Sequence, residues 1–96
     1  MVFSKELRAL VLSGDITVSF RLWRSPKVKP GGRYRVGPGQ IEVDEVELLP
    51  FSAISAADLS CTGETDLEAL RQRAAHAGPI DDDTLLYRVA FHVVEA

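Results

Sequence analysis

The segment most informative about the fold is residues 14–23, Gly14-Asp15-Ile16-Thr17-Val18-Ser19-Phe20-Arg21-Leu22-Trp23. A turn opens there into a strand, and successive side chains of a strand point to opposite faces. One face is wholly apolar and consists of Ile16, Val18, Phe20 and Leu22. The other carries two hydroxyls, a guanidinium and an indole, from Thr17, Ser19, Arg21 and Trp23. We expect the apolar face to be buried in a core and the polar face to border a cleft.

A basic segment begins on this strand and runs through the loop that follows it. Residues 16–41 hold six basic side chains and no acidic one: Arg21, Arg24, Lys27, Lys29, Arg33 and Arg35. An aromatic ring beside several cations suits a flat anionic ligand such as a nucleotide, because the base stacks on the ring and the phosphates meet the cations. We therefore expect these six cations to form a nucleic-acid-binding face together with Thr17, Ser19 and Trp23.

The formal net charge of −3 conceals an uneven distribution. Residues 1–41 carry a net charge of +6, whereas residues 42–96 carry −9. A segregated chain of this kind can offer a positive patch to nucleic acid. The alternative is that the two halves attract each other across the fold and neutralise the patch.

Length and composition predict an ordinary small domain. Ninety-six residues with 46% hydrophobic content can form a modest core, so we expect a single domain over 1–96. The one cysteine, Cys61, cannot form an internal disulfide, which favours a reducing cytoplasmic setting. We expect no signal peptide and no membrane partner, since the N-terminus lacks a signal-peptide layout and no apolar run approaches the ~20 residues of a membrane span.

No metal ion or other cofactor is expected. The two histidines, His76 and His92, and Cys61 lie in unrelated segments and lack the spacing of a zinc site. His76 is placed near the end of a helix, where a cation complements the helix dipole, and His92 on the outward face of the last strand. The acidic run 81–83 is interpreted as a solvated loop.

The elements of the first half are short and well separated by turn residues. A helix capped by Ser4 should run to about Leu12 and end at Ser13-Gly14, with Leu7, Leu10 and Val11 forming its apolar stripe. Strands are expected at 17–23, 33–36 and 40–49, joined by a Pro/Gly-rich connector and a tight turn at 37–39. The apolar residues of 40–49 change parity near Asp44-Glu45, which predicts a β-bulge.

The second half supplies two helices and the clearest strand. A short helical turn should begin at Ser55, and Thr65 with Glu68 fits a capping box that opens a helix to about Ala77. Residues 85–94 alternate as a strand. Four or five strands with two or three short helices predict a small α+β domain, twisted or barrel-like, with connections too short for a doubly wound fold.

Several of these blocks resemble the ASCH domains, a branch of the PUA-like β-barrel superfamily. The resemblance rests on the order and register of Gly14 to Arg21, Lys29 to Gly37, Ile41 to Val43, and Leu86 to Phe91. The family's opening is similar to Gly-x-Lys-Thr-x-Thr-x-Arg. Gly14, Thr17 and Arg21 match it, Ser19 stands in place of the second threonine, and Ile16 stands in place of the lysine.

The resemblance implies a PUA-like barrel of about five strands that binds RNA or a modified nucleotide in a cleft. Some single-domain members are similar to an amidohydrolase of N4-acetylcytidine, which uses the lysine and threonine of the opening motif and a glutamate from the helical segment. Others have been associated with RNA cleavage. By this resemblance Ser19 would stand for the threonine and Glu64 for the glutamate, while Ile16 leaves the lysine without a counterpart.

The sequence therefore favours binding over catalysis. The first hypothesis is a cleft for RNA, single-stranded nucleic acid or a nucleotide, without chemistry. The second is a hydrolase of modified nucleosides or RNA on the same cleft, with Ser19, Arg21 and Glu64 in the working roles. The third is a protein-interaction module whose Arg/Trp face docks an acidic partner, since these residues are common interface hot spots.

Overall fold

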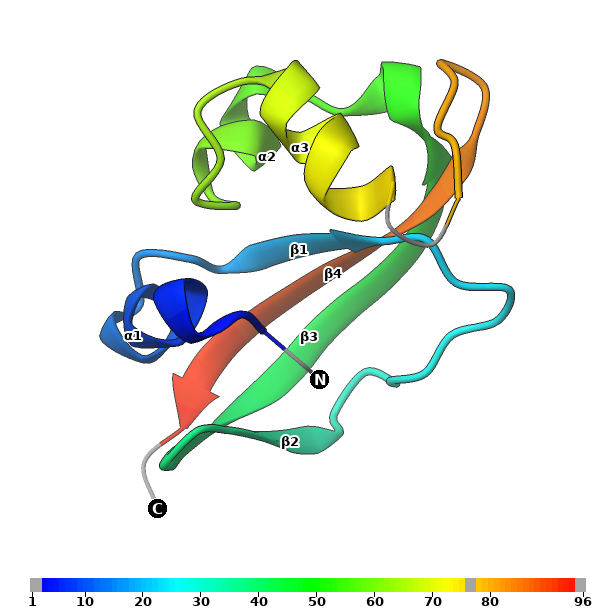
Figure 1. The fold of residues 1–96 in the computed structure, drawn as a ribbon. Coiled ribbons are helices and arrows are strands. Elements are labelled where there is room, and N and C mark those ends of the chain that lie inside the picture. Colours follow the sequence, from blue (N-terminus) through cyan, green and yellow to red (C-terminus); the bar gives the residue numbers. More distant parts are fainter. Residues whose placement is uncertain (1–2, 76–77, 95–96) are drawn as a thin grey trace.

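The computed structural model describes residues 3–75 and 78–94. Its first half contains α1 (Lys5–Ser13), β1 (Val18–Arg21), β2 (Arg33–Val36) and β3 (Gly39–Pro50). A short 3-10 helix, η1 (Phe51–Ala53), then leads to α2 (Ala56–Ser60), α3 (Leu67–Ala74) and the final strand β4 (Leu85–Val94), as Figure 1 shows.

The four strands form one antiparallel sheet in the order β1-β4-β3-β2. The predicted α+β class is confirmed, but four strands are present among the described residues where about five were expected. The sheet is also open, with β1 and β2 as its edges. The residues that join these two edge strands, 22–32, form a loop that carries no strand. No helix among the described residues is long and apolar enough to cross a membrane.

The predicted β-bulge lies in β3. Val43 stands opposite Phe91 of β4 and Glu45 stands opposite Ala90, so the register shifts at Asp44. The extra residue returns the apolar side chains to one face, because Ile41 and Val43 before the bulge and Val46 and Leu48 after it all lie opposite odd-numbered residues of β4. The parity change in the sequence therefore marks a continuous apolar face.

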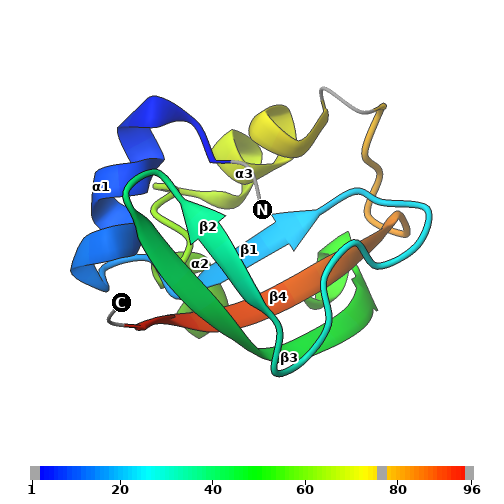
Figure 2. The ribbon, with the colours of Figure 1, turned by 90° about the horizontal axis from the view of Figure 1, so that it is seen from below.

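The sheet is covered on both faces, which divides the core in two. On the face that we call the α3 face, Val18, Phe20 and Leu86 pack with Leu70 and Ala74 of α3. On the opposite face, called here the α1 face, the buried cluster is formed by Phe3, Val11, Ile16, Val28, Val36, Ile41, Val43, Val89 and Phe91. Figures 1 and 2 show α3 and α1 on their respective sides of β1.

Ile16 therefore departs from the predicted pattern. Alternation grouped it with Val18 and Phe20, but it precedes β1 and packs into the cluster of the α1 face, where it is 2% exposed. The period-two rule holds only within a strand. The residues that precede β1 therefore do not continue its alternation of side chains.

The first helix begins after Ser4 as predicted, but details of both longer helices differ from expectation. Ser4 occupies the N-cap of α1 without a side-chain hydrogen bond, and Leu10 of the predicted stripe is 39% exposed. At α3 the N-cap is Asp66, whose Oδ1 accepts a hydrogen bond of 2.8 Å from the Ala69 amide. The predicted capping box on Thr65 is therefore wrong by one residue, because the aspartate side chain is an equally good acceptor.

The helix ends show a further difference. Gly14 ends α1 in the left-handed conformation (φ 88°), as predicted. The last turn of α3 stops at Ala74 among the described residues. The expected end at Ala77, and His76 with it, lies outside the described residues.

Candidate functional site

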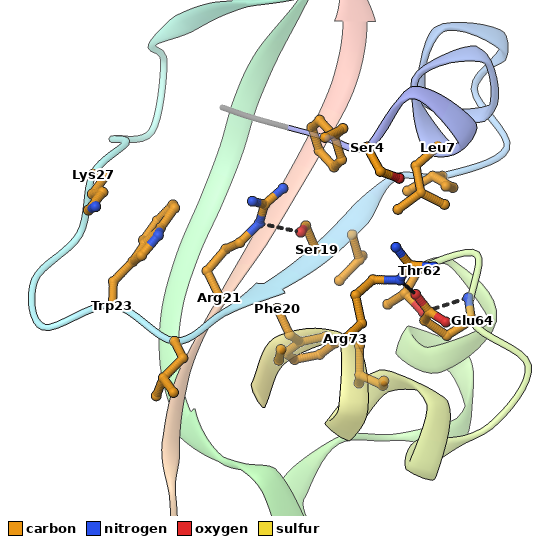
Figure 3. Close-up of a pocket in the computed structure, with 16 residues that line it drawn as sticks. Ser4, Leu7, Ser19, Phe20, Arg21, Trp23, Lys27, Thr62, Glu64 and Arg73 are labelled. Carbon is orange, nitrogen blue, oxygen red and sulfur yellow. Dashed lines mark hydrogen bonds and ion pairs between the residues drawn. The ribbon is translucent and has the colours of Figure 1, made fainter. Parts of the chain in front are cut away.

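A pocket of about 490 Å³ opens along the edge strand β1 (Figure 3). All four residues of β1 line it, which is understandable because no strand pairs with this edge of the sheet. One wall comes from the N-terminal segment and α1, with Phe3, Ser4 and Leu7. The other comes from α3 and the turn before it, with Thr62, Glu64, Leu70, Arg73 and Ala74. The size and the mainly apolar walls are those of a small-molecule site.

Arg21 lies at the centre of this pocket, between Ser19 and the rim. Its Nε donates a hydrogen bond of 2.8 Å to Oγ of Ser19, and its Cζ lies 4.7 Å from the centroid of the Phe3 ring. Burial lowers the pKa of the guanidinium, which nevertheless remains charged at neutral pH. Among the described residues no carboxylate forms an ion pair with Arg21. The pocket therefore holds a partly desolvated positive charge.

Glu64 lies on the other wall of the pocket, where Figure 3 shows its carboxylate beside the Arg73 side chain. Its side chain is 9% exposed and forms an ion pair with Nε of Arg73 on α3. The backbone is fixed as well, since the Glu64 amide donates a hydrogen bond of 3.2 Å to Oγ1 of the buried Thr62. A buried, oriented carboxylate of this kind can accept hydrogen bonds from a ligand.

Trp23 and Lys27 form the rim at the opposite end of the pocket (Figure 3). Trp23 lies beyond the end of β1, and its ring centroid is 6.1 Å from that of Tyr87 on β4, with the planes tilted by 38°. Its half-buried ring is thus fixed by a neighbouring aromatic side chain. Lys27 is exposed and brings a mobile cation to the same rim.

The structure brings some of the predicted site residues together and leaves others apart. Ser19, Arg21, Trp23, Lys27 and Glu64 all line the pocket, from β1, the loop after it and the turn before α3. Val18 and Phe20 are each 5% exposed, as the alternation predicts. The pocket does not include Thr17, Arg24, Lys29, Arg33 or Arg35.

The excluded cations lie elsewhere for local reasons. In β2, Val36 is buried and Tyr34 packs against the core, so the alternate side chains Arg33 and Arg35 point outward. Arg33 is engaged by Glu42 at 3.1 Å. Arg24 and Lys29 are exposed on the loop that follows β1.

The two oppositely charged halves of the chain remain largely separate. Of the six cations in residues 16–41, Arg33 alone forms an ion pair with a described residue. The remaining ion pairs of the described residues join acidic groups to basic groups of the same half, namely Arg71, Arg73, Arg88 and His92. The positive segment is therefore not neutralised by the acidic half.

Sequence reasoning missed several residues of the pocket. No local sequence pattern marks these residues as part of a site, because they reach it only through the packing of α1 and α3 against β1. They are Phe3, Leu7, Thr62 and Arg73. For Arg73 the sequence does contain one indication. It follows Glu64 by nine residues, with a helix start between them, and pairs back to it.

A second polar cluster lies away from the pocket, at the bulge. Glu42, Asp44 and His92 each offer a ligand atom, and these atoms lie within 4.8 Å of one another. Nδ1 of His92 is 2.8 Å from Oδ1 of Asp44, whereas Nε2 is 3.8 Å from Oε2 of Glu42. The two ring nitrogens thus face different carboxylates, which is the geometry of ion pairing on an exposed surface.

Comparison with solved structures identifies the fold. A crystal structure of an ASCH domain from Lactobacillus crispatus superposes with a TM-score of 0.73, over 92% of this chain and 70% of that one, at 22% identity. A protein of the DUF984 family from Enterococcus faecalis gives a TM-score of 0.69, over 93% and 67% of the two chains, at 21% identity. The fold is therefore that of the ASCH domain, as the sequence motifs indicated. No protein-family model and no curated protein matches the sequence.

Proposed function

We propose that this chain, which has the fold of an ASCH domain, binds a nucleotide unit in the pocket along β1. The ligand is RNA, single-stranded nucleic acid or a free nucleotide. The fold supports this proposal because ASCH and PUA-like domains commonly bind nucleic acid. The uneven charge supports it too, since the basic segment remains open to an anion.

The observation that carries the proposal is that Arg21 is partly buried and forms no ion pair with a described carboxylate. A guanidinium that is partly removed from water costs free energy, and proteins normally offset that cost with a carboxylate. Among the described residues Arg21 has the Ser19 hydroxyl and the Phe3 ring, but no carboxylate. A phosphate is the natural partner for such a group, because the guanidinium donates two parallel hydrogen bonds to it.

The rest of the pocket suits the other parts of a nucleotide. Phe3, Leu7 and Trp23 offer apolar and aromatic surface to a base or a ribose. Ser19, Thr62 and the carboxylate of Glu64 offer a few fixed polar groups for orientation.

The test is to replace Arg21 by methionine and titrate both proteins calorimetrically with a single-stranded RNA hexanucleotide at low salt. Wild type should bind with micromolar or weaker affinity, and Arg21→Met should lose at least about tenfold. Its melting temperature should stay the same or rise, because the variant removes a desolvated charge that no carboxylate pairs. Arg35→Met, exposed and outside the pocket, is the matched control.

The result that overturns the proposal is equal binding by wild type and Arg21→Met, or no binding of RNA or DNA by wild type. If wild type binds neither RNA nor DNA, docking of an acidic protein partner becomes the better explanation of the Arg/Trp face.

A second candidate is favoured by one observation: Glu64 lies in the same pocket as Ser19. By the family resemblance, these two residues would stand for the working threonine and glutamate of the N4-acetylcytidine amidohydrolases. The remaining groups weigh against turnover, since Ser19 Oγ accepts its hydrogen bond from a protonated Arg21, Glu64 is ion-paired, and the lysine position holds the buried Ile16. An amide hydrolysis needs a base for the nucleophile and a donor for the oxyanion, and an arginine cannot serve as the base.

We therefore expect wild type to show little or no deacylation of N4-acetylcytidine. Ile16→Lys restores the opening pattern and should be the first substitution to raise the rate, although burial of a lysine will lower the melting temperature markedly. Ile16→Met, similar in length and uncharged, controls for repacking. Chromatography of the nucleoside measures the rate. Rapid turnover by wild type would instead show that the protein is an enzyme.

A further inference from the structure

We infer that the ligand is a single strand of at least two nucleotides, with one unit in the pocket and the next base on an adjacent apolar surface. We call this surface the platform and define it as Trp23, Tyr87 and Leu48. The inference rests on the proposed function and adds to it the length of the ligand and a second subsite.

The platform is a row of side chains on the α1 face of the sheet. Tyr87 of β4 stands opposite Arg21 of β1 and opposite Leu48 of β3, so the three side chains share a face. The ring of Trp23 packs against Tyr87 at 6.1 Å. Leu48 is 48% exposed, and Trp23 and Tyr87 are half-buried. An aromatic pair and an aliphatic side chain thus form one partly exposed surface.

The end of the face where the platform lies is left open by the helices. Figure 2 shows α1 at the end of the sheet where β4 finishes, whereas Tyr87 and Leu48 are at the end where β4 begins. The pocket and the platform are continuous, because Trp23 belongs to both. A strand that leaves the pocket past Trp23 therefore meets the platform directly.

The charges around the platform favour a polyanion. Arg24 follows Trp23, and Lys27 stands on the same rim; neither forms an ion pair with a described residue. The acidic residues of β3 nearby, Glu45 and Glu47, stand opposite Ala90 and Arg88 and so lie on the other face of the sheet. Apolar contact with bases and cations for the phosphates are the two elements of single-strand binding.

The experiment compares ligands of different length on the whole chain. Uridine monophosphate, tetrauridylate and tetradeoxyuridylate are titrated separately at one low salt concentration, and binding is followed by the fluorescence of Trp23, the one tryptophan of the sequence. The tetranucleotides should bind at least about tenfold more tightly than the monophosphate and quench Trp23 more strongly, because a second base stacks beside the indole. Comparison of the RNA and DNA tetramers shows which sugar is preferred.

Two variants of the platform test whether it supplies the additional affinity for the tetranucleotides. Leu48→Ala should remove much of the advantage of the tetramer and leave the affinity for uridine monophosphate within about twofold. Tyr87→Ala should remove as much of that advantage and also weaken uridine monophosphate, because Tyr87 packs against Trp23 of the pocket. Leu67→Ala is the matched control, since Leu67 is similarly exposed (40%) but lies at the start of α3 and outside both pocket and platform. Leu48 is exposed enough that its replacement should leave the fold intact, which keeps the test decisive if Tyr87→Ala is unstable.

The outcomes separate the two proposals. If the monophosphate and the tetramers bind equally well, or if neither platform variant weakens the tetramers, the platform is overturned and the pocket stands. If no nucleotide binds, both fail. If polyglutamate of the same charge binds as tightly as the tetramers, the surface recognises acidic protein and the platform for bases is overturned.

Discussion

Gly63 holds the turn that carries Glu64 in a conformation that other residues avoid. Its φ is +80°, and a Cβ built on it would lie 2.7 Å from Cδ1 of Ile16. Two separate costs would therefore follow from a side chain at this position: backbone strain in the left-handed region and a clash with a buried isoleucine.

Gly63→Ala should accordingly destabilise the protein by about 2 kcal/mol, the sum of a left-handed penalty and an overpacking penalty. Ile16→Val removes the Cδ1 atom and should cost about 1 kcal/mol alone. The double variant should be more stable than the sum of the two single costs, because the shortened side chain relieves the clash. Urea unfolding of the four proteins measures this coupling, and simple additivity would show that strain at φ is the whole cost.

At the scale of single residues, alternation within β1 correctly predicted which side chains of the strand are buried. Val18 and Phe20 are buried, and Ser19, Arg21 and Trp23 all reach the pocket. The pattern could not place Ile16, because the rule of alternation does not extend past the end of a strand. It also could not find Arg73 or Thr62, whose proximity to β1 depends on how a distant helix packs.

Among the elements, α2 and β4 are tied together by a bidentate ion pair. Nε and Nη2 of Arg88 donate hydrogen bonds of 2.9 and 3.0 Å to the two carboxylate oxygens of Asp58. These bonds hold the pKa of Asp58 below its ordinary value and raise the pKa of Arg88. Both side chains are less than a quarter exposed, so water screens the pair only in part.

Asp58→Asn should lower the stability by about 1 kcal/mol at pH 7, since the amide loses the charge and one acceptor. Because the pKa of Asp58 is lower in the folded state, the contribution of the pair is fully present above about pH 4 and is lost as the pH falls through the folded value. Melting curves of wild type and variant should therefore converge toward pH 2. Asp83→Asn, exposed and outside the ion pairs of the described residues, should change little at either pH.

Elements were predicted best where the signal is local. Strand 33–36 was placed to the residue, and the bulge was found from the parity change alone. The start of α3 was missed by one position because Thr65 and Asp66 are neighbouring candidates for the same cap, and the choice between them depends on backbone conformation.

For the molecule as a whole, charge is divided between surfaces as well as between halves of the sequence. Four cations that form no ion pair with a described residue lie on β1 and the loop after it, namely Arg21, Arg24, Lys27 and Lys29. The acidic groups pair mostly within their own half of the sequence. The molecule can therefore attract a polyanion in spite of its net charge of −3.

The salt dependence of RNA binding should reveal this division. The logarithm of the affinity should fall linearly with the logarithm of the salt concentration, and Lys27→Ala should reduce the slope by about 0.7, the value for one lost contact to a single strand. Arg35→Ala should leave the slope unchanged, because Arg35 points away from the pocket. An equal change in both variants would indicate a diffuse field without a defined phosphate contact.

The openness of the sheet was the part of the architecture that the sequence could not supply. The strands were recognisable one by one, but whether β1 and β2 approach each other depends on the path of the loop 22–32, which has no periodic pattern. The family resemblance gave the correct fold type, but it implied a barrel of about five strands, whereas the described strands form an open sheet of four.

The place of β1 at the edge of the sheet links the site to local opening of the structure. Detaching β1 breaks one ladder, with β4, whereas detaching β4 breaks two, so amide hydrogens of β1 exchange with solvent at a lower energetic cost. A ligand that contacts both β1 and α3 holds this edge strand in its folded position. By mass action its binding suppresses the opened species, and the slowing of exchange in β1 becomes a direct measure of occupancy.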